Sequence, residues 1–97
     1  MPAALKVGEA VFIEWDDSCC ASGWKDESHL GDLDASECVS VGWIARKTKH
    51  SITIAPHVGV NQGVVLRQTN GHMMIPLSAI RRVERLRLPS LERVGRY

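Results

Sequence analysis

The sequence predicts an all-β fold, a small barrel of five to six strands built from one domain, residues 1–97. Three observations predict it. Short segments alternate apolar and polar residues, turn-forming residues separate them at short intervals, and the chain is too short for more than one modest core. The main exception is a long acidic loop, residues 16–37, after the first expected strand.

The first strand is expected within Leu5–Trp15, where apolar residues recur at every second position. Period two over this length is typical of a half-buried strand. Residues 16–37 lack any period and are rich in Ser, Gly and Asp. Loops of this length are uncommon in compact domains unless they are functional or disordered. Disorder would leave Trp24 in water, so we expect Trp24 either to contact a partner or to fold back over an open barrel end.

The second strand is expected over Cys38–Thr48, where a glycine at position 42 predicts a bulge or sharp bend. The mid-strand place of Trp43 favours a core residue. A third strand ends at Pro56, and Asn70-Gly71 predicts a hairpin between two further strands.

A tight 3₁₀ turn is expected over Leu77–Ile80, followed by a closing strand. Residues 79–88 also fit a helical spacing, so helix and strand compete there. We favour the strand because it completes the all-β pattern. Residues 89–97 form the expected C-terminal tail, which begins at a proline.

The segments "VSVGWIARKTKHSITIAPH" and "IPLSAIRRVERL" resemble, in their order of strands and turns, the SH3/Sm-like small barrels and the bacterial Sm-like RNA chaperones. This resemblance implies the barrel fold and RNA binding. The RNA-contacting residues of that family do not map onto this chain, so none is carried over.

A second resemblance rests on "IEWDDSCCASGWKD" and the Val-Gly-Trp strand. This Trp-x-Asp-Ser…Gly-Trp…Val-Gly-Trp pattern is similar to that of small proteins encoded by bacteriophages and prophages. The resemblance implies a phage setting in the host cytoplasm and a role as an inhibitor or ligand trap, such as counter-defence.

The formal net charge is +1, but the charged residues are distributed unevenly along the sequence. Residues 1–40 carry two basic and nine acidic residues, and residues 41–97 carry ten basic and two acidic ones. Such halves neutralise each other within a monomer or between subunits of a homo-oligomer, or the basic half faces a polyanion. No apolar run is long enough for a membrane span and no secretory signal precedes the first strand. Three cysteines, an odd number, favour a reduced cytoplasmic setting over a disulfide framework.

The predicted function is non-enzymatic binding of a small anionic, nucleotide-like ligand or of a host protein. Tryptophan faces stack on bases or anchor interfaces, and carboxylates and hydroxyls accept hydrogen bonds. The candidate residues lie in the acidic loop and in the basic turn after the second strand: Trp15, Asp16, Asp17, Ser18, Trp24, Lys25, Arg46, Lys47, Lys49 and His50.

One alternative is an Sm-like RNA- or DNA-binding barrel, with arginines that pair with phosphates. Its candidates are Arg67, Arg81, Arg82, Arg85 and Arg87.

Another alternative is a small zinc or cysteine-dependent protein built on Cys19, Cys20, His29 and Cys38. Zinc accepts Cys and His ligands, but this spacing matches no zinc finger. The sequence has no nucleophile elbow, phosphate-binding loop or dinucleotide fingerprint. We therefore expect no enzyme, no catalytic residues and no cofactor.

Overall fold

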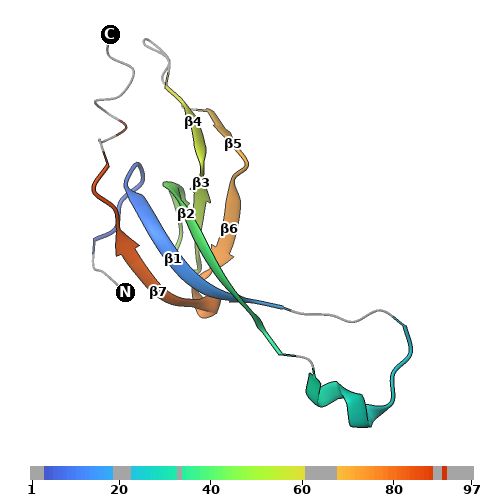
Figure 1. The fold of residues 1–97 in the computed structure, drawn as a ribbon. Helices are drawn as coiled ribbons and strands as arrows, with labels where there is room; N and C mark the ends of the chain where they lie inside the picture. Colours follow the sequence, from blue (N-terminus) through green and yellow to red (C-terminus); the bar gives the residue numbers. More distant parts are fainter. Residues whose placement is uncertain (1–3, 19–22, 33, 61–67, 89–90, 92–97) are drawn as a thin grey trace.

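The structure is a computed structural model that describes residues 4–18, 23–32, 34–60, 68–88 and 91 (Figure 1). Seven strands are described: β1 (Ala10–Asp17), β2 (Ser36–Lys47), β3 (Ser51–Ala55), β4 (His57–Gly59), β5 (Gln68–Asn70), β6 (Met73–Pro76) and β7 (Ile80–Arg85). Two 3₁₀ helices accompany them: η1 (Glu27–Asp32) and η2 (Leu77–Ala79). The all-β prediction is confirmed for this part of the chain.

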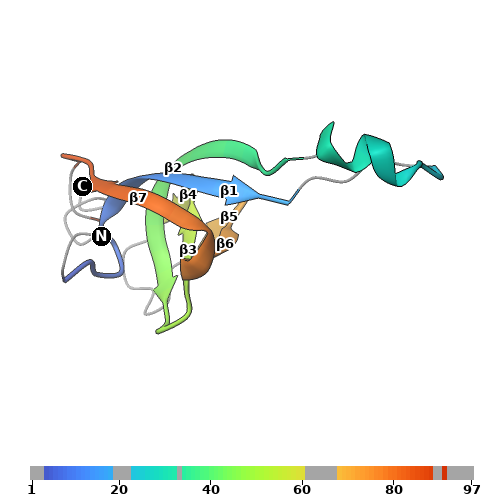
Figure 2. The ribbon, with the colours of Figure 1, turned by 90° about the horizontal axis from the view of Figure 1, so that it is seen from below.

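Five strands form one antiparallel sheet in the order β6-β3-β2-β1-β7, and β4 and β5 form a separate two-stranded sheet. The outer strands β6 and β7 do not pair, so the sheet curls without closing (Figure 2). The expected closed barrel is therefore not observed. The short η2 turn carries the chain from one sheet edge to the other, as the predicted 3₁₀ turn and closing strand require.

The core lies on one face of the curled sheet. Alternate residues of β1 supply Val11 and Ile13, both fully buried, and Val83 of β7 lies beside Ile13. The other strands add aliphatic side chains, and the buried cluster is Leu5, Val11, Ile13, Ile44, Ile52, Ile54, Ile75 and Val83. The period-two pattern is confirmed for Val11 and Ile13, but the strand begins only at Ala10. Leu5 packs against the sheet from the segment before it, and Val7 in that segment is 57% exposed.

The residues of β2 that face the core differ from those expected from the sequence. Val39 and Val41 are 64% and 54% exposed, and Ile44 supplies the buried position. Trp43 pairs with Ala10, so it lies on the face opposite to Val11 and is only half-buried. The expectation that Trp43 belongs to the core is wrong. A strand presents alternate residues to opposite faces, so register against β1 decides which set is covered.

Gly42 is required by a close approach of two strands. A β-carbon at Gly42 would lie 2.9 Å from the carbonyl oxygen of Ala55. The register irregularity itself falls between Ile44 and Arg46, next to this point. The irregularity that Gly42 predicted is thus present in β2, but it lies a few residues beyond the glycine.

The prediction that the two strands around Asn70-Gly71 pair with each other as a hairpin is wrong. β5 and β6 flank Gly71, but β5 pairs with β4 and β6 pairs with β3. Gly71 has φ +72° and lies against Pro56, which separates β3 from β4. The left-handed conformation that Asn-Gly favours is used at a bend between two successive strand pairs. Residues 61–67, between β4 and β5 in the sequence, lie outside the described residues.

Of the predicted tail, only Leu91 is described, and it is buried. Residues 89–90 and 92–97 lie outside the described residues.

We predict that Gly42→Ala destabilises the fold by roughly 1–3 kcal/mol, because the new methyl group would press on the backbone of β3. Urea denaturation measures the change. Gly31→Ala is the matched control, since a β-carbon there meets nothing within 4 Å. Equal midpoints for the two variants would contradict the close approach.

Candidate functional site

The strongest candidate site is a projection that we call the arm, residues 17–37. β1 and β2 remain paired through Asp17 and Ser36. Pairing of β1 with β7 ends at Trp15, and β3 pairs with β2 only from Trp43 onward. The two strands thus leave the sheet as a ribbon, and η1 lies at its far end, away from the core (Figures 1 and 2). The predicted loop is therefore part strand, part 3₁₀ helix.

The arm buries none of the side chains whose exposure is described. Trp24 is 104% exposed and Leu30, in η1, is 52% exposed. Of the two alternatives for Trp24, folding back over an open barrel end is not observed. Ordering a residue costs about 1–2 kcal/mol of backbone entropy, and burial of apolar surface normally offsets that cost. The described part of the arm has no such burial of its own.

The arm is also acidic. Residues 17–37 contain six acidic residues and one basic residue, Lys25. The carboxylates of Asp17 and Asp34 accept hydrogen bonds of 2.8 Å from the backbone N–H groups of Ser18 and Ala35. These local contacts shape the turns and leave the negative charge at the surface.

Trp15 has a structural role at the root of the arm. It packs against the core, and its Nε1 donates a 3.0 Å hydrogen bond to Ser40 Oγ. Asp16, on the opposite face, lies 3.5 Å from the Arg81 guanidinium. Trp15 and Asp16 are thus held by contacts with the sheet, whereas Trp24 is exposed.

The basic turn lies at the other end of β2 from the arm. Its exposed members are Arg46, Lys47, Lys49 and His50. Lys47 Nζ donates a 3.2 Å hydrogen bond to the carbonyl oxygen of Leu5. Since β2 spans 12 residues at about 3.3 Å each, one chain does not bring these cations to Trp24.

Three arginines of the predicted nucleic-acid set are already paired with carboxylates of the same chain. Arg81 lies 3.2 Å from Glu37, and Arg85 lies 2.7 Å from Glu9. Arg82 pairs with Glu84 and with Glu14, the latter at 3.0 Å, and lies 5.9 Å from the centre of the Phe12 ring. Hydrogen bonds to Glu37 and Glu84, respectively, raise the pKa values of Arg81 and Arg82.

The remaining two arginines of the predicted nucleic-acid set are Arg67 and Arg87. Arg87 is exposed, and Arg67 lies outside the described residues. Together with the paired arginines of β7, this leaves no basic stripe along the closing strand. Part of the charge asymmetry in the sequence is thus neutralised within the chain.

The thiol candidates are not assembled into a centre by the described residues. Cys38 is half-buried with a free thiol, and its Sγ donates a 3.6 Å contact to the carbonyl oxygen of Ser36. Cys19 and Cys20 lie outside the described residues, as does the side chain of His29. Within the described part, no group of three or more His, Cys, Asp or Glu could hold a metal ion.

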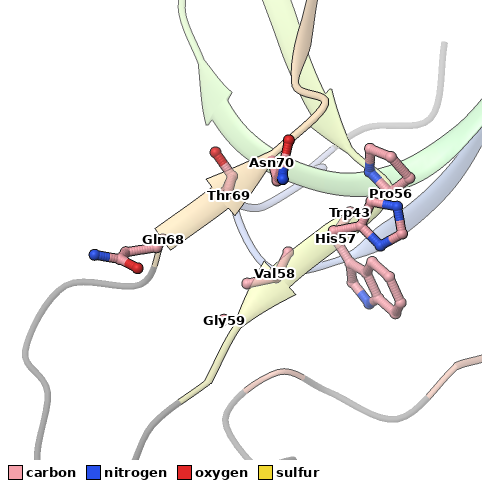
Figure 3. A pocket seen from close by; sticks show the side chains of 8 residues that line it. All are labelled: Trp43, Pro56, His57, Val58, Gly59, Gln68, Thr69 and Asn70. Atoms are coloured by element: carbon pink, nitrogen blue, oxygen red, sulfur yellow. The ribbon is translucent and has the colours of Figure 1, made fainter.

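The structure adds a groove that the sequence did not predict. Trp43, Pro56, β4 and β5 line an open groove of about 640 Å³ (Figure 3). Trp43 Nε1 is buried and has no acceptor among the described residues. An unpaired buried donor of this kind costs about 1–3 kcal/mol. Pro56 was the one sequence signal, because it separates β3 from β4 and so creates the second sheet.

Comparisons with protein-family models, curated proteins and solved structures find no match for this chain. The function must therefore be argued from its own residues. No helix in the described segments has the length and hydropathy that a membrane crossing requires.

We predict that the Glu9–Arg85 pair makes stability depend on pH. The hydrogen bond from Arg85, with help from the Lys6 backbone N–H, lowers the pKa of Glu9 below its ordinary value of 4.5. A lowered folded-state pKa stabilises the fold above 4.5, and this contribution is lost as the pH falls through the lowered pKa. Urea titrations above and well below pH 4.5 should show a smaller decrease for Glu9→Gln than for the parent. An identical decrease would contradict it.

Proposed function

We propose that this protein is a non-enzymatic binding module that docks onto a partner protein through its arm. One observation carries the proposal: Trp24 is fully exposed at the end of a ribbon that leaves the sheet. Burying a Trp removes roughly 150–250 Å² from water, worth about 4–6 kcal/mol gross at about 25 cal/mol/Å². Exposed tryptophans on a projecting element are typical anchors of protein interfaces.

The side chains of the arm indicate which kind of partner surface would fit it. Trp24 and Leu30 require an apolar pocket, and the surrounding carboxylates require a basic rim. A basic rim would also accelerate association by electrostatic steering. The resemblance to phage-encoded proteins supports a host protein as that partner, in the host cytoplasm and in a counter-defence role.

The arm gives less support to the other predicted ligands. A small anion would meet an acidic surface at the arm, and the basic turn that could hold it lies at the other end of β2. A site that uses both regions would have to form between two subunits of a homo-oligomer. The SH3/Sm-like barrel remains a proposal for the fold type, supported by the order of strands and by the 3₁₀ turn before β7.

We predict that Trp24→Ala weakens partner binding by about 2 kcal/mol or more, roughly 30-fold, because the anchor is lost. The tagged protein is used to isolate a partner from the host, which is identified by mass spectrometry and purified. Titration calorimetry then measures its affinity for the parent and for each variant. Affinity should also decrease with added salt, because the arm is acidic.

Met74→Ala is the matched control, because Met74 is 57% exposed on β6, a strand that takes no part in the arm. It should bind like the parent. A purified partner that binds Trp24→Ala as tightly as the parent would overturn the proposal, as would a loss of equal size in Met74→Ala.

A further inference from the structure

The groove beside β4 and β5 is a second candidate site, distinct from the arm. Among the described residues, its lining comes from Trp43, Pro56 and the two short strands, and none of these lining residues is Asp, Glu, Lys or Arg. The described lining thus offers no permanently charged side chain, in a protein with 24% charged residues. It disfavours phosphate or carboxylate as the group that is bound there, because neither would find a counter-charge.

Trp43 provides a broad aromatic wall. It pairs with Ala10 on one side and Ala55 on the other, and both alanines are buried. Small side chains on both neighbouring strands leave room for the indole above the sheet. Figure 3 shows the indole beside the ring of His57, at one end of the groove. An aromatic wall of this kind favours a ligand with a flat π-face.

The two short strands supply hydrogen-bonding groups to the groove lining. Gln68 and Asn70 have exposed side chains on the same face of β5, and each amide carries both donors and an acceptor. The Thr69 hydroxyl lies 3.1 Å from His72 Nδ1. Asn and Gln amides are the side chains that pair in a bidentate manner with the edge of an adenine ring.

We propose that this groove binds the planar ring of an uncharged nucleobase, stacked on Trp43 and held by the Gln68 and Asn70 amides. The volume of about 640 Å³ lies within the roughly 300–1,000 Å³ that is usual for small-ligand sites. The same ring chemistry is offered by a free nucleoside and by a single-stranded nucleic acid.

The test uses Gly59, which lines the groove and has no side chain. A β-carbon there would lie 3.6 Å from the nearest atom, an ordinary contact, so Gly59→Leu fills the groove without straining the backbone. Gly31→Leu is the matched control, because a β-carbon at Gly31 meets nothing within 4 Å and this residue lies in η1, outside the groove. Thermal unfolding checks that both variants fold.

The probes are adenosine, guanosine, cytidine and uridine, added separately to ¹⁵N-labelled protein. At least one nucleoside should shift the side-chain amide signals of Gln68 and Asn70. Its affinity should fall at least tenfold in Gly59→Leu and in Asn70→Ala, with no change in Gly31→Leu. Binding should depend little on salt, because the groove is uncharged. Short single-stranded oligonucleotides form the second arm and show whether the base is preferred free or within a chain.

The proposal is overturned if neither nucleosides, at concentrations on the order of 10 mM, nor oligonucleotides shift these amides. Binding that survives in Gly59→Leu would place the base elsewhere and also overturns it. Oligonucleotide binding that falls steeply with salt and is unaffected by Gly59→Leu would do the same.

Discussion

The pairing of β1 with β2 is the interaction on which the rest of the structure depends. Eight consecutive residues of β1 pair with β2, and only the first part of this ribbon has a third strand beside it. Where neighbours are present, Val11 and Ile13 reach the core. Where they end, the same ribbon continues into solvent and carries η1 outward. One uninterrupted ladder thus produces both the stable sheet and the arm.

Charge follows the same division. Along the sheet, arginines of β7 pair with four acidic residues, Glu9, Glu14, Asp16 and Glu37, so acid and base neutralise each other there. These exposed pairs add little stability individually, with a median of about 0–1 kcal/mol. Their larger effect is to occupy the arginines that could otherwise bind phosphates. Beyond the sheet, the carboxylates of the arm have no such basic strand beside them.

The sequence was sufficient for elements in which one local signal dominates. Alternation fixed the buried face of β1, and the apolar "IPLSAI" segment fixed the 3₁₀ turn before β7. It was insufficient where the outcome depends on which strands become neighbours. Trp43 fits either face of an alternating strand, and Gly71 fits either a hairpin or a bend. Exposure of Trp24 could not be deduced either, because composition does not reveal that β1 and β2 stay paired beyond the sheet. Prediction of the groove would have required the position of Pro56 relative to Gly71, and that position is set by tertiary structure.

Trp24 is fully exposed to solvent in the isolated protein. Fluorine NMR of protein labelled with 5-fluorotryptophan tests this exposure directly, with the resonance assigned from Trp24→Phe. This resonance should show the full solvent isotope shift between H₂O and D₂O, while those of Trp15 and Trp43 should show smaller shifts. A Trp24 resonance shielded from solvent in the isolated protein would contradict docking through the arm, because the anchor would then already be covered.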